Sequence, residues 1–111
     1  MELSEIQRLV DANAERYSKK HGIPLSVDLL VLKLMEETGE FAEALTVSRN
    51  LCRAEKRVDA VTSQENLAAE IADVAVTVLH LASMLKIDLE AALEKKALAK
   101  GRAYLAERNA A

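Results

Sequence analysis

The chain has 111 residues, a formal net charge of -3 and a single cysteine. This length fits one domain over residues 1–111, the mixed charge offers no basic surface for nucleic acid, and one cysteine excludes an intramolecular disulfide framework. Half of the residues are apolar, but only 3% are aromatic and proline occurs once, a composition typical of an all-α protein. The lone Cys52 and the lack of a secretory signal pattern at the N-terminus predict a reducing, cytoplasmic location.

The first predicted helix covers about residues 4–20. Ser4 and Gln7 have the spacing of a capping box at its start, and a glycine follows its basic end, as is common after helix C-termini. Asn13 interrupts the apolar stripe, either as a hydrogen-bonded polar residue or as an amide that contacts a ligand. Tyr17 lies on the same stripe.

The second predicted helix starts near Ser26 and reaches at least residue 45. It carries Glu36, Glu37 and Glu40 inside an otherwise largely apolar run. Residues three apart lie on one face of a helix, so Glu37 and Glu40 point the same way. Glutamate is a good helix former and such pairs are common on solvated helices, so this cluster alone does not identify a site.

Residues 46–61 have no single predicted structure. The segment could extend the second helix, form a short helix or be a flexible loop. Its charge fits either a solvated surface or a loop that folds over an anionic substrate. The basic residues here are Arg49, Arg53, Lys56 and Arg57.

The third predicted helix covers about residues 63–85 and follows a second capping-box pair, Thr62 and Glu65. It carries Glu70 and Asp73, which are again three residues apart. Acids are rarely buried without a partner, so an acidic pair inside such an apolar segment needs a group that compensates its charge.

The second half of this helix is apolar on nearly every side, which indicates burial on every side. One small protomer seldom provides that, so the sequence predicts an interface between copies of the chain. The apolar run over residues 74–85 is interrupted by Thr77, His80 and Ser83 and is too short to span a bilayer, so we expect no membrane association. His80 shares the stripe of the acidic pair, either as a hydrogen-bonded core residue or as a ligand.

The last predicted helix covers about residues 89–108, with Asp88 as its N-cap. Lys96 and Lys100 share one face, and Arg102 lies on another face of an ideal helix. Cationic groups near a carboxylate-bound metal suit a polyphosphate. Ordinary solvation of a C-terminal helix is the alternative interpretation.

The two acidic pairs are more informative together than separately. If the second and third helices pack antiparallel, the carboxylates of Glu37, Glu40, Glu70 and Asp73 converge. Four ionised acids in a small space repel one another, and they persist there only with a compensating cation or with bound protons. Ligation by carboxylate oxygens alone favours Mg²⁺, with Mn²⁺ as the second choice.

Two stretches resemble the MazG-type branch of the all-α nucleoside triphosphate pyrophosphohydrolases. Residues 33–45 read KLMEETGEFAEAL and residues 70–73 read EIAD, similar to the EExxE and ExxD motifs of that family. The resemblance extends over about residues 25–104. It implies an all-α, four-helix bundle-like protomer that packs into a homodimer or a dimer-based homotetramer.

The resemblance also implies residue roles. Glu37, Glu40, Glu70 and Asp73 would coordinate Mg²⁺, and Glu36 would assist the metal shell or the attacking water. The family's last helix often reads Lys-x-x-x-Asn-x-Arg-x-Tyr, and Lys100 replaces the asparagine here. The candidate catalytic residues are Glu36, Glu37, Glu40, Glu70 and Asp73. The candidate substrate-binding residues are Lys33, Lys96, Lys100, Arg102 and Tyr104. For the nucleobase pocket that the resemblance implies, the candidate walls are the Tyr17 face of the first helix and the start of the second.

The implied reaction is Mg²⁺-dependent hydrolysis of a nucleoside or deoxynucleoside triphosphate to the monophosphate and pyrophosphate, in nucleotide-pool house-cleaning. Two alternatives stay open: a phosphoribosyl-ATP pyrophosphohydrolase, and a non-catalytic helical dimerisation module that retains the metal site. A carboxylate di-iron bundle is disfavoured because such bundles use Glu-x-x-His pairs, and the sequence has none.

Overall fold

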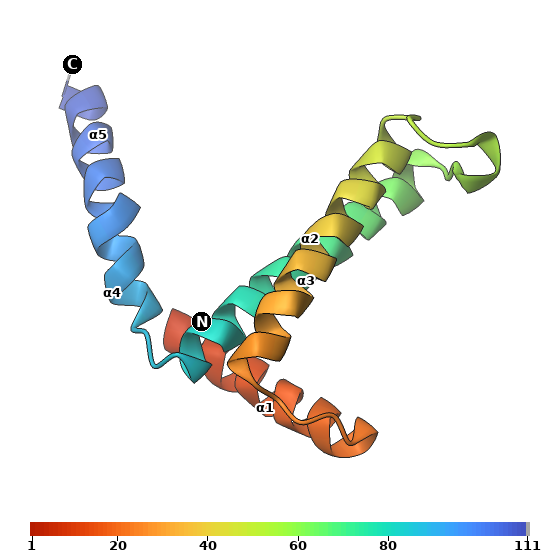
Figure 1. Ribbon diagram of the computed structural model, residues 1–111. Helices are drawn as coiled ribbons and strands as arrows, with labels where there is room; N and C mark the ends of the chain where they lie inside the picture. Colours follow the sequence, from red (N-terminus) through yellow and green to blue (C-terminus); the bar gives the residue numbers. More distant parts are fainter. Residues whose placement is uncertain (111) are drawn as a thin grey trace.

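The protein is all helical over residues 1–110, which the computed structural model describes, with no strand in this range. Its elements in chain order are α1 (Leu3–His21), α2 (Val27–Ser48), the 3-10 turn η1 (Ala54–Lys56), α3 (Ala60–Met84), α4 (Leu89–Leu93), the π-helical turn η2 (Glu94–Leu98) and α5 (Ala99–Ala110). The last three follow one another without a break and form one long helix (Figure 1). The prediction of an all-α fold with four helices is therefore confirmed.

The centre of the fold is an antiparallel pair formed by α2 and α3, and α1 crosses the end of this pair (Figure 1). Leu30 on α2 and Ala82 on α3 are the buried apolar residues. Three polar residues on α3, which are Ser63, Thr77 and His80, are also buried. Polar groups therefore occupy a large share of this small core, and their hydrogen bonds matter for the site described below.

The start of α1 differs from its sequence prediction. Glu2 is the N-cap residue and its side chain makes no capping hydrogen bond, so the predicted capping box of Ser4 and Gln7 is wrong. The start of α2 agrees with its prediction, because the Ser26 hydroxyl accepts a hydrogen bond of 3.1 Å from the backbone N–H of Leu29.

The start of α3 also differs from its prediction. Asp59, and not Thr62, is the N-cap residue: its Oδ1 accepts a 2.7 Å hydrogen bond from the Thr62 backbone N–H, and its Oδ2 accepts one from the Thr62 hydroxyl. These hydrogen bonds lower the pKa of Asp59. A carboxylate at this position also interacts favourably with the helix dipole, which explains why it caps the helix in place of the hydroxyl. Asp88 caps α4 as predicted.

The segment between α2 and α3 is a loop with one short turn. Helix α2 ends at Ser48, and η1 is the regular element that follows before α3. Lys56 Nζ lies 3.8 Å from Glu43 Oε1 and so links this loop to α2. Residues 46–61 therefore combine the structures considered: α2 extends to residue 48, a loop with the short helix η1 follows, and α3 begins at residue 60.

The long C-terminal helix projects away from the other three (Figure 1). Leu98, Tyr104 and Leu105 are exposed on it, and Arg102 forms an ion pair with Glu94 across the π-helical turn. A single chain thus packs three of its four helices together. The bundle is not completed within one chain over the described residues.

By length and composition alone, α3 is apolar enough to cross a membrane. The sequence-based expectation concerns the shorter run over residues 74–85, so this finding on the whole helix does not contradict it. This finding is weak evidence for a membrane span, because the core helices of soluble proteins meet the same criteria. The helix carries Glu70 and Asp73 near its middle, and their side chains lie against acids of α2.

Candidate metal and substrate site

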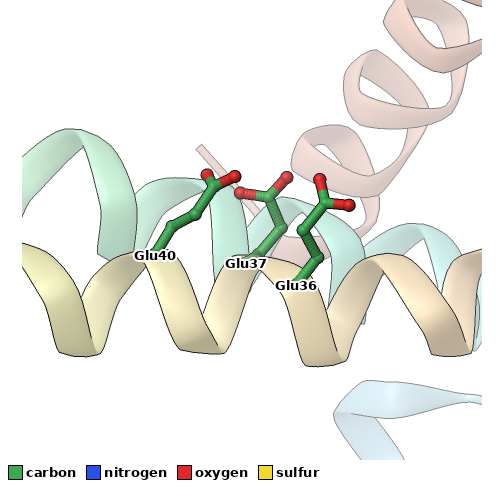
Figure 2. A group of neighbouring side chains, drawn as sticks. All are labelled: Glu36, Glu37 and Glu40. Carbon is green, nitrogen blue, oxygen red and sulfur yellow. The ribbon is translucent and has the colours of Figure 1, made fainter.

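Three carboxylates stand on the same side of α2, where Glu36, Glu37 and Glu40 extend from neighbouring turns (Figure 2). One oxygen from each lies within 4.8 Å of one oxygen from each of the others. The spacing arises from the helical repeat, which places residues three and four apart on one face. This group is partly open to solvent, since Glu36 and Glu40 are exposed.

A second group joins the two central helices. Oxygens of Glu37, Glu70 and Asp73 also lie within 4.8 Å of one another. Glu37 belongs to both groups, and its side chain is only 14% exposed. The structure therefore brings together the four acids that the sequence predicts to converge, with Glu37 at the centre. Below, the acidic cluster means these four residues together with Glu36.

The electrostatics of the acidic cluster indicate an uncompensated negative charge. Burial raises the pKa of Glu37, and the charges of Glu40 and Asp73 raise it further. Burial and the same two neighbours raise the pKa of Glu70. One oxygen of each residue, Oε2, is buried without a hydrogen-bond partner. A buried acceptor without a partner is costly, so these oxygens suit a cation or a hydrogen-bond donor.

Lys33 supplies part of the missing positive charge. Its Nζ lies 3.0 Å from Glu36 Oε1 and 3.9 Å from Glu37 Oε1. The hydrogen bond to Glu36 is the main reason that the pKa of Lys33 is raised. Because one ammonium group faces five carboxyl groups, it cannot neutralise the acidic cluster, and a further cation fits there.

A cleft of about 440 Å³ opens beside the acidic cluster. Its walls come from α1, from the connector and start of α2, and from the second half of α3. The lining residues are Val10, Asn13, Ala14, Tyr17, Ile23, Leu25, Leu29, Leu30, Lys33, Glu37, Asp73, Val76, Thr77 and His80. Largely apolar walls with a few polar groups are typical of a small-molecule site. The cleft lies on the faces of α1 and α2 where the sequence predicts a nucleobase pocket.

The family model of the MazG nucleotide pyrophosphohydrolase domain matches residues 25–101, a range that contains the whole acidic cluster. The chain belongs to the MazG family. Membership implies a nucleotide substrate and nucleotide pyrophosphohydrolase activity. Comparisons with curated proteins and with solved structures give no match.

The candidate substrate residues of this MazG domain fall into two places. Lys33 lies at the acidic cluster and lines the cleft. The other four, which are Lys96, Lys100, Arg102 and Tyr104, lie on the projecting C-terminal helix and not at the cluster of the same chain. Arg102 pairs with Glu94 there, and Arg108 lies over the ring of Tyr104 at 5.9 Å.

Asp11, which lies before the range that the family model matches, was missed by the sequence-based predictions. Its Oδ1 lies 2.7 Å from Nδ1 of His80, and the contact joins α1 to α3 across the cleft wall. The apolar stripe of the first helix gives no signal for this pairing, because Asp11 reads there as an ordinary polar residue. A buried histidine on α3 that requires a partner is the one hint that the sequence offers.

The raised pKa values predict how the stability of the metal-free protein depends on pH. In the folded state Glu37 and Glu70 hold protons more tightly than they do in the unfolded chain. Their contribution to the free energy of unfolding is thus fully present below the ordinary glutamate pKa and is lost as the pH rises through the raised values. The melting temperature in EDTA, measured for wild type and Glu37→Gln across this interval, should fall more steeply for wild type. Parallel profiles for the two proteins would contradict the assignment.

Proposed function

We propose that this MazG domain hydrolyses nucleoside triphosphates to nucleoside monophosphates and pyrophosphate, with Mg²⁺ or Mn²⁺ held by Glu37, Glu40, Glu70 and Asp73. The observation that carries the proposal is the position of Glu37, which belongs to both groups of acids and also lines the cleft. A cation at the acids and a nucleoside in the cleft would thus lie side by side. That arrangement suits a polyphosphate ester of a nucleoside.

The residues fit a hard divalent cation. All of the proposed ligand atoms are carboxylate oxygens, which Mg²⁺ and Mn²⁺ prefer. The partnerless oxygens of Glu37 and Glu70 are free to accept such an ion. When bound, the cation supplies neutralisation of the polyphosphate and acidification of a coordinated water.

The chain's own residues would bind and position the substrate and would transfer protons. The apolar walls of the cleft would hold the nucleoside and exclude water from it. Lys33, at the boundary between acids and cleft, is placed to contact a phosphate oxygen. Glu36 lies at the exposed edge of the cluster, outside the group formed by Glu37, Glu70 and Asp73. It is therefore the acid best placed to accept a proton from the water that attacks the α-phosphorus.

We further propose that the active form is a homodimer or homotetramer. Ile71 and Val78 form an exposed apolar strip on α3, and Leu98 and Leu105 are exposed on the projecting helix. Monomeric proteins rarely leave large contiguous apolar surfaces exposed. A second copy would cover them and would bring the cations of its last helix within reach of the acidic cluster. A role in maintaining the nucleotide pool would place the protein in the cytoplasm.

The dimer proposal predicts the effect of a charge on the exposed strip. Ile71 is 56% exposed in the single chain, so Ile71→Glu should leave the protomer fold intact but bury an unpaired charge in the interface, which is strongly unfavourable. Sedimentation should then give the mass of one chain, 12.2 kDa, with an unchanged helical circular dichroism signal. The control Leu9→Glu, at an exposed position on α1, should keep the wild-type mass. An Ile71→Glu protein that sediments like wild type would place the interface elsewhere.

Pyrophosphate release from a panel of canonical and modified nucleoside triphosphates, in Mg²⁺ and in EDTA, tests the proposed function. We expect Mg²⁺-dependent release, with modified bases among the accepted substrates if the role is house-cleaning. Phosphoribosyl-ATP belongs in the same panel, and its exclusive cleavage would replace the proposed substrate class. No release from any substrate, together with retained Mg²⁺ binding, would identify a non-catalytic module.

A further inference from the structure

The cleft contains one buried polar atom that the reaction described above does not use. His80 on α3 is only 8% exposed and lines the cleft. Its Nδ1 is 2.7 Å from Asp11 Oδ1 on α1, whereas its Nε2 is buried without a hydrogen-bond partner. One ring nitrogen is thus bound to the protein, and the other has no partner.

The Asp11 contact determines what this nitrogen can offer. A carboxylate accepts hydrogen bonds, so Nδ1 carries the hydrogen and donates it to Asp11. In the neutral ring Nε2 then has a lone pair and no hydrogen. In that form of the ring it is an acceptor, and a ligand that fills this part of the cleft must place an N–H or O–H group against it or leave it unsatisfied.

Its distance from the acidic cluster indicates which part of a nucleotide it meets. His80 lies seven residues after Asp73 on the same helix, which is about 10 Å along the axis. This is the scale of a nucleoside. A nucleotide with its triphosphate at the acids would therefore place its base near His80 and its sugar between the two.

Two other polar side chains on the cleft wall make hydrogen bonds within the protein. The Thr77 hydroxyl donates to the backbone carbonyl of Asp73. The Asn13 side-chain oxygen accepts hydrogen bonds from the Arg16 guanidinium. His80 Nε2 is thus a fixed nitrogen without a partner on the cleft wall, about two helical turns from the acids.

We propose that His80, oriented by Asp11, determines base specificity by accepting a hydrogen bond from an exocyclic amino group of the substrate's nucleobase. The inference rests on the proposed function, because it takes the cleft to hold the nucleoside of a triphosphate. It favours cytosine over uracil and adenine over hypoxanthine, because in each pair the disfavoured base has a carbonyl oxygen in place of the amino group. Two acceptors then face each other in a dry site, which is repulsive. Asp11 is a positioning residue in this account.

Matched substrate pairs test the inference. In wild type, kcat/KM for dCTP over dUTP, and for dATP over dITP, should each exceed unity by at least about tenfold, as expected when a buried hydrogen bond is lost and its acceptor is left unpaired. The His80→Phe variant retains an aromatic ring and should lose the preference, mainly through a higher KM for the amino bases. In the Asp11→Asn variant the amide can either donate a hydrogen bond to Nδ1 or accept one from it. The ratio of the two kcat/KM values within each pair should therefore fall toward unity. If His80 only holds α1 and α3 together, the substitutions should lower kcat/KM equally for both substrates of each pair. That result would overturn the inference.

A second readout does not require turnover. The chain has two histidines, so ¹⁵N-labelled rings can be assigned with the His21→Gln variant. A non-hydrolysable α,β-methylene analogue of dCTP, added with Mg²⁺, should shift the His80 Nε2 resonance, and the dUTP analogue should not. If no triphosphate is hydrolysed but this shift occurs, the proposed function fails and the specificity role stands. If triphosphates are hydrolysed without any base preference or selective shift, the specificity role alone fails. A shift that depends on the sugar 3′-hydroxyl and not on the base, or no shift with any analogue, also overturns it.

Discussion

Replacing Glu37 by glutamine should reduce Mg²⁺-dependent pyrophosphate release by at least about 100-fold, because even residues one step removed from a metal typically cost 10- to 100-fold when they are mutated. Glu37 is shared by the two groups of acids and lines the cleft. Replacing its carboxylate would therefore disturb both the binding of the cation and the wall of the cleft. Initial rates at saturating Mg²⁺, compared with wild type, measure the effect.

Stability measurements separate this effect from misfolding. Glutamine is almost the same size but removes one charge from a cluster of repelling carboxyl groups, so the melting temperature in EDTA should stay the same or rise. In wild type Mg²⁺ should raise the melting temperature, since it binds only the folded site, and in Glu37→Gln it should do so much less. Glu65→Gln, an exposed position on α3 outside the cluster, is the matched control and should behave like wild type. Full activity in Glu37→Gln would remove the basis of the metal assignment.

Mixing two inactive variants should restore activity if the site combines residues from two copies. Glu37→Gln disables the acidic cluster, and a Lys96→Ala/Arg102→Ala double variant disables the cationic helix. In a dimer with two equivalent sites, random exchange makes half of the dimers mixed and gives each mixed dimer one intact site, or about a quarter of the wild-type rate. The measurement is pyrophosphate release before and after the two proteins are unfolded together and refolded.

The physical reason for this expectation is the position of the last helix. It projects away from the other three helices, so its cations do not reach the acidic cluster of their own chain. Refolding each variant alone is the control and should yield no recovery. If the mixture also stays inactive while mass measurements show mixed dimers, the substrate contacts of this helix are absent or act within one chain.

The helices themselves were largely predictable because their signals are local. Apolar periodicity and composition determine where each helix lies, and Ser26 and Asp88 cap helices as predicted. The two capping-box predictions were wrong for a reason that is also local. Each was read from one plausible residue pair, whereas the cap depends on competition between neighbours, and a carboxylate at Asp59 replaces the hydroxyl of Thr62.

The acidic cluster could be predicted because its geometry follows from two regular elements. Spacing along a helix places each pair on one face, and antiparallel packing of α2 and α3 brings the pairs together. The contact between Asp11 and His80 could not be predicted, since it joins residues 69 apart in sequence through the crossing of α1 over α3. No periodicity encodes that crossing.

The direction of the C-terminal helix could not be predicted from the sequence either. The pattern of residues predicts a helix after Asp88, but the packing of its apolar side chains depends on surfaces that one chain does not provide. The π-helical turn at Glu94–Leu98 further changes which side chains share a face after it. Arg102 and Glu94 pair across this turn, which an ideal helix would not indicate.

The central claim is that the acidic cluster directs water to the α-phosphorus of a nucleoside triphosphate. Product analysis by ³¹P NMR after reaction in ¹⁸O-labelled water with Mg²⁺ tests it most directly. The account predicts pyrophosphate without label and a nucleoside monophosphate that carries the label, with both products absent in EDTA. Release of inorganic phosphate and a diphosphate, or label in the pyrophosphate, would contradict it.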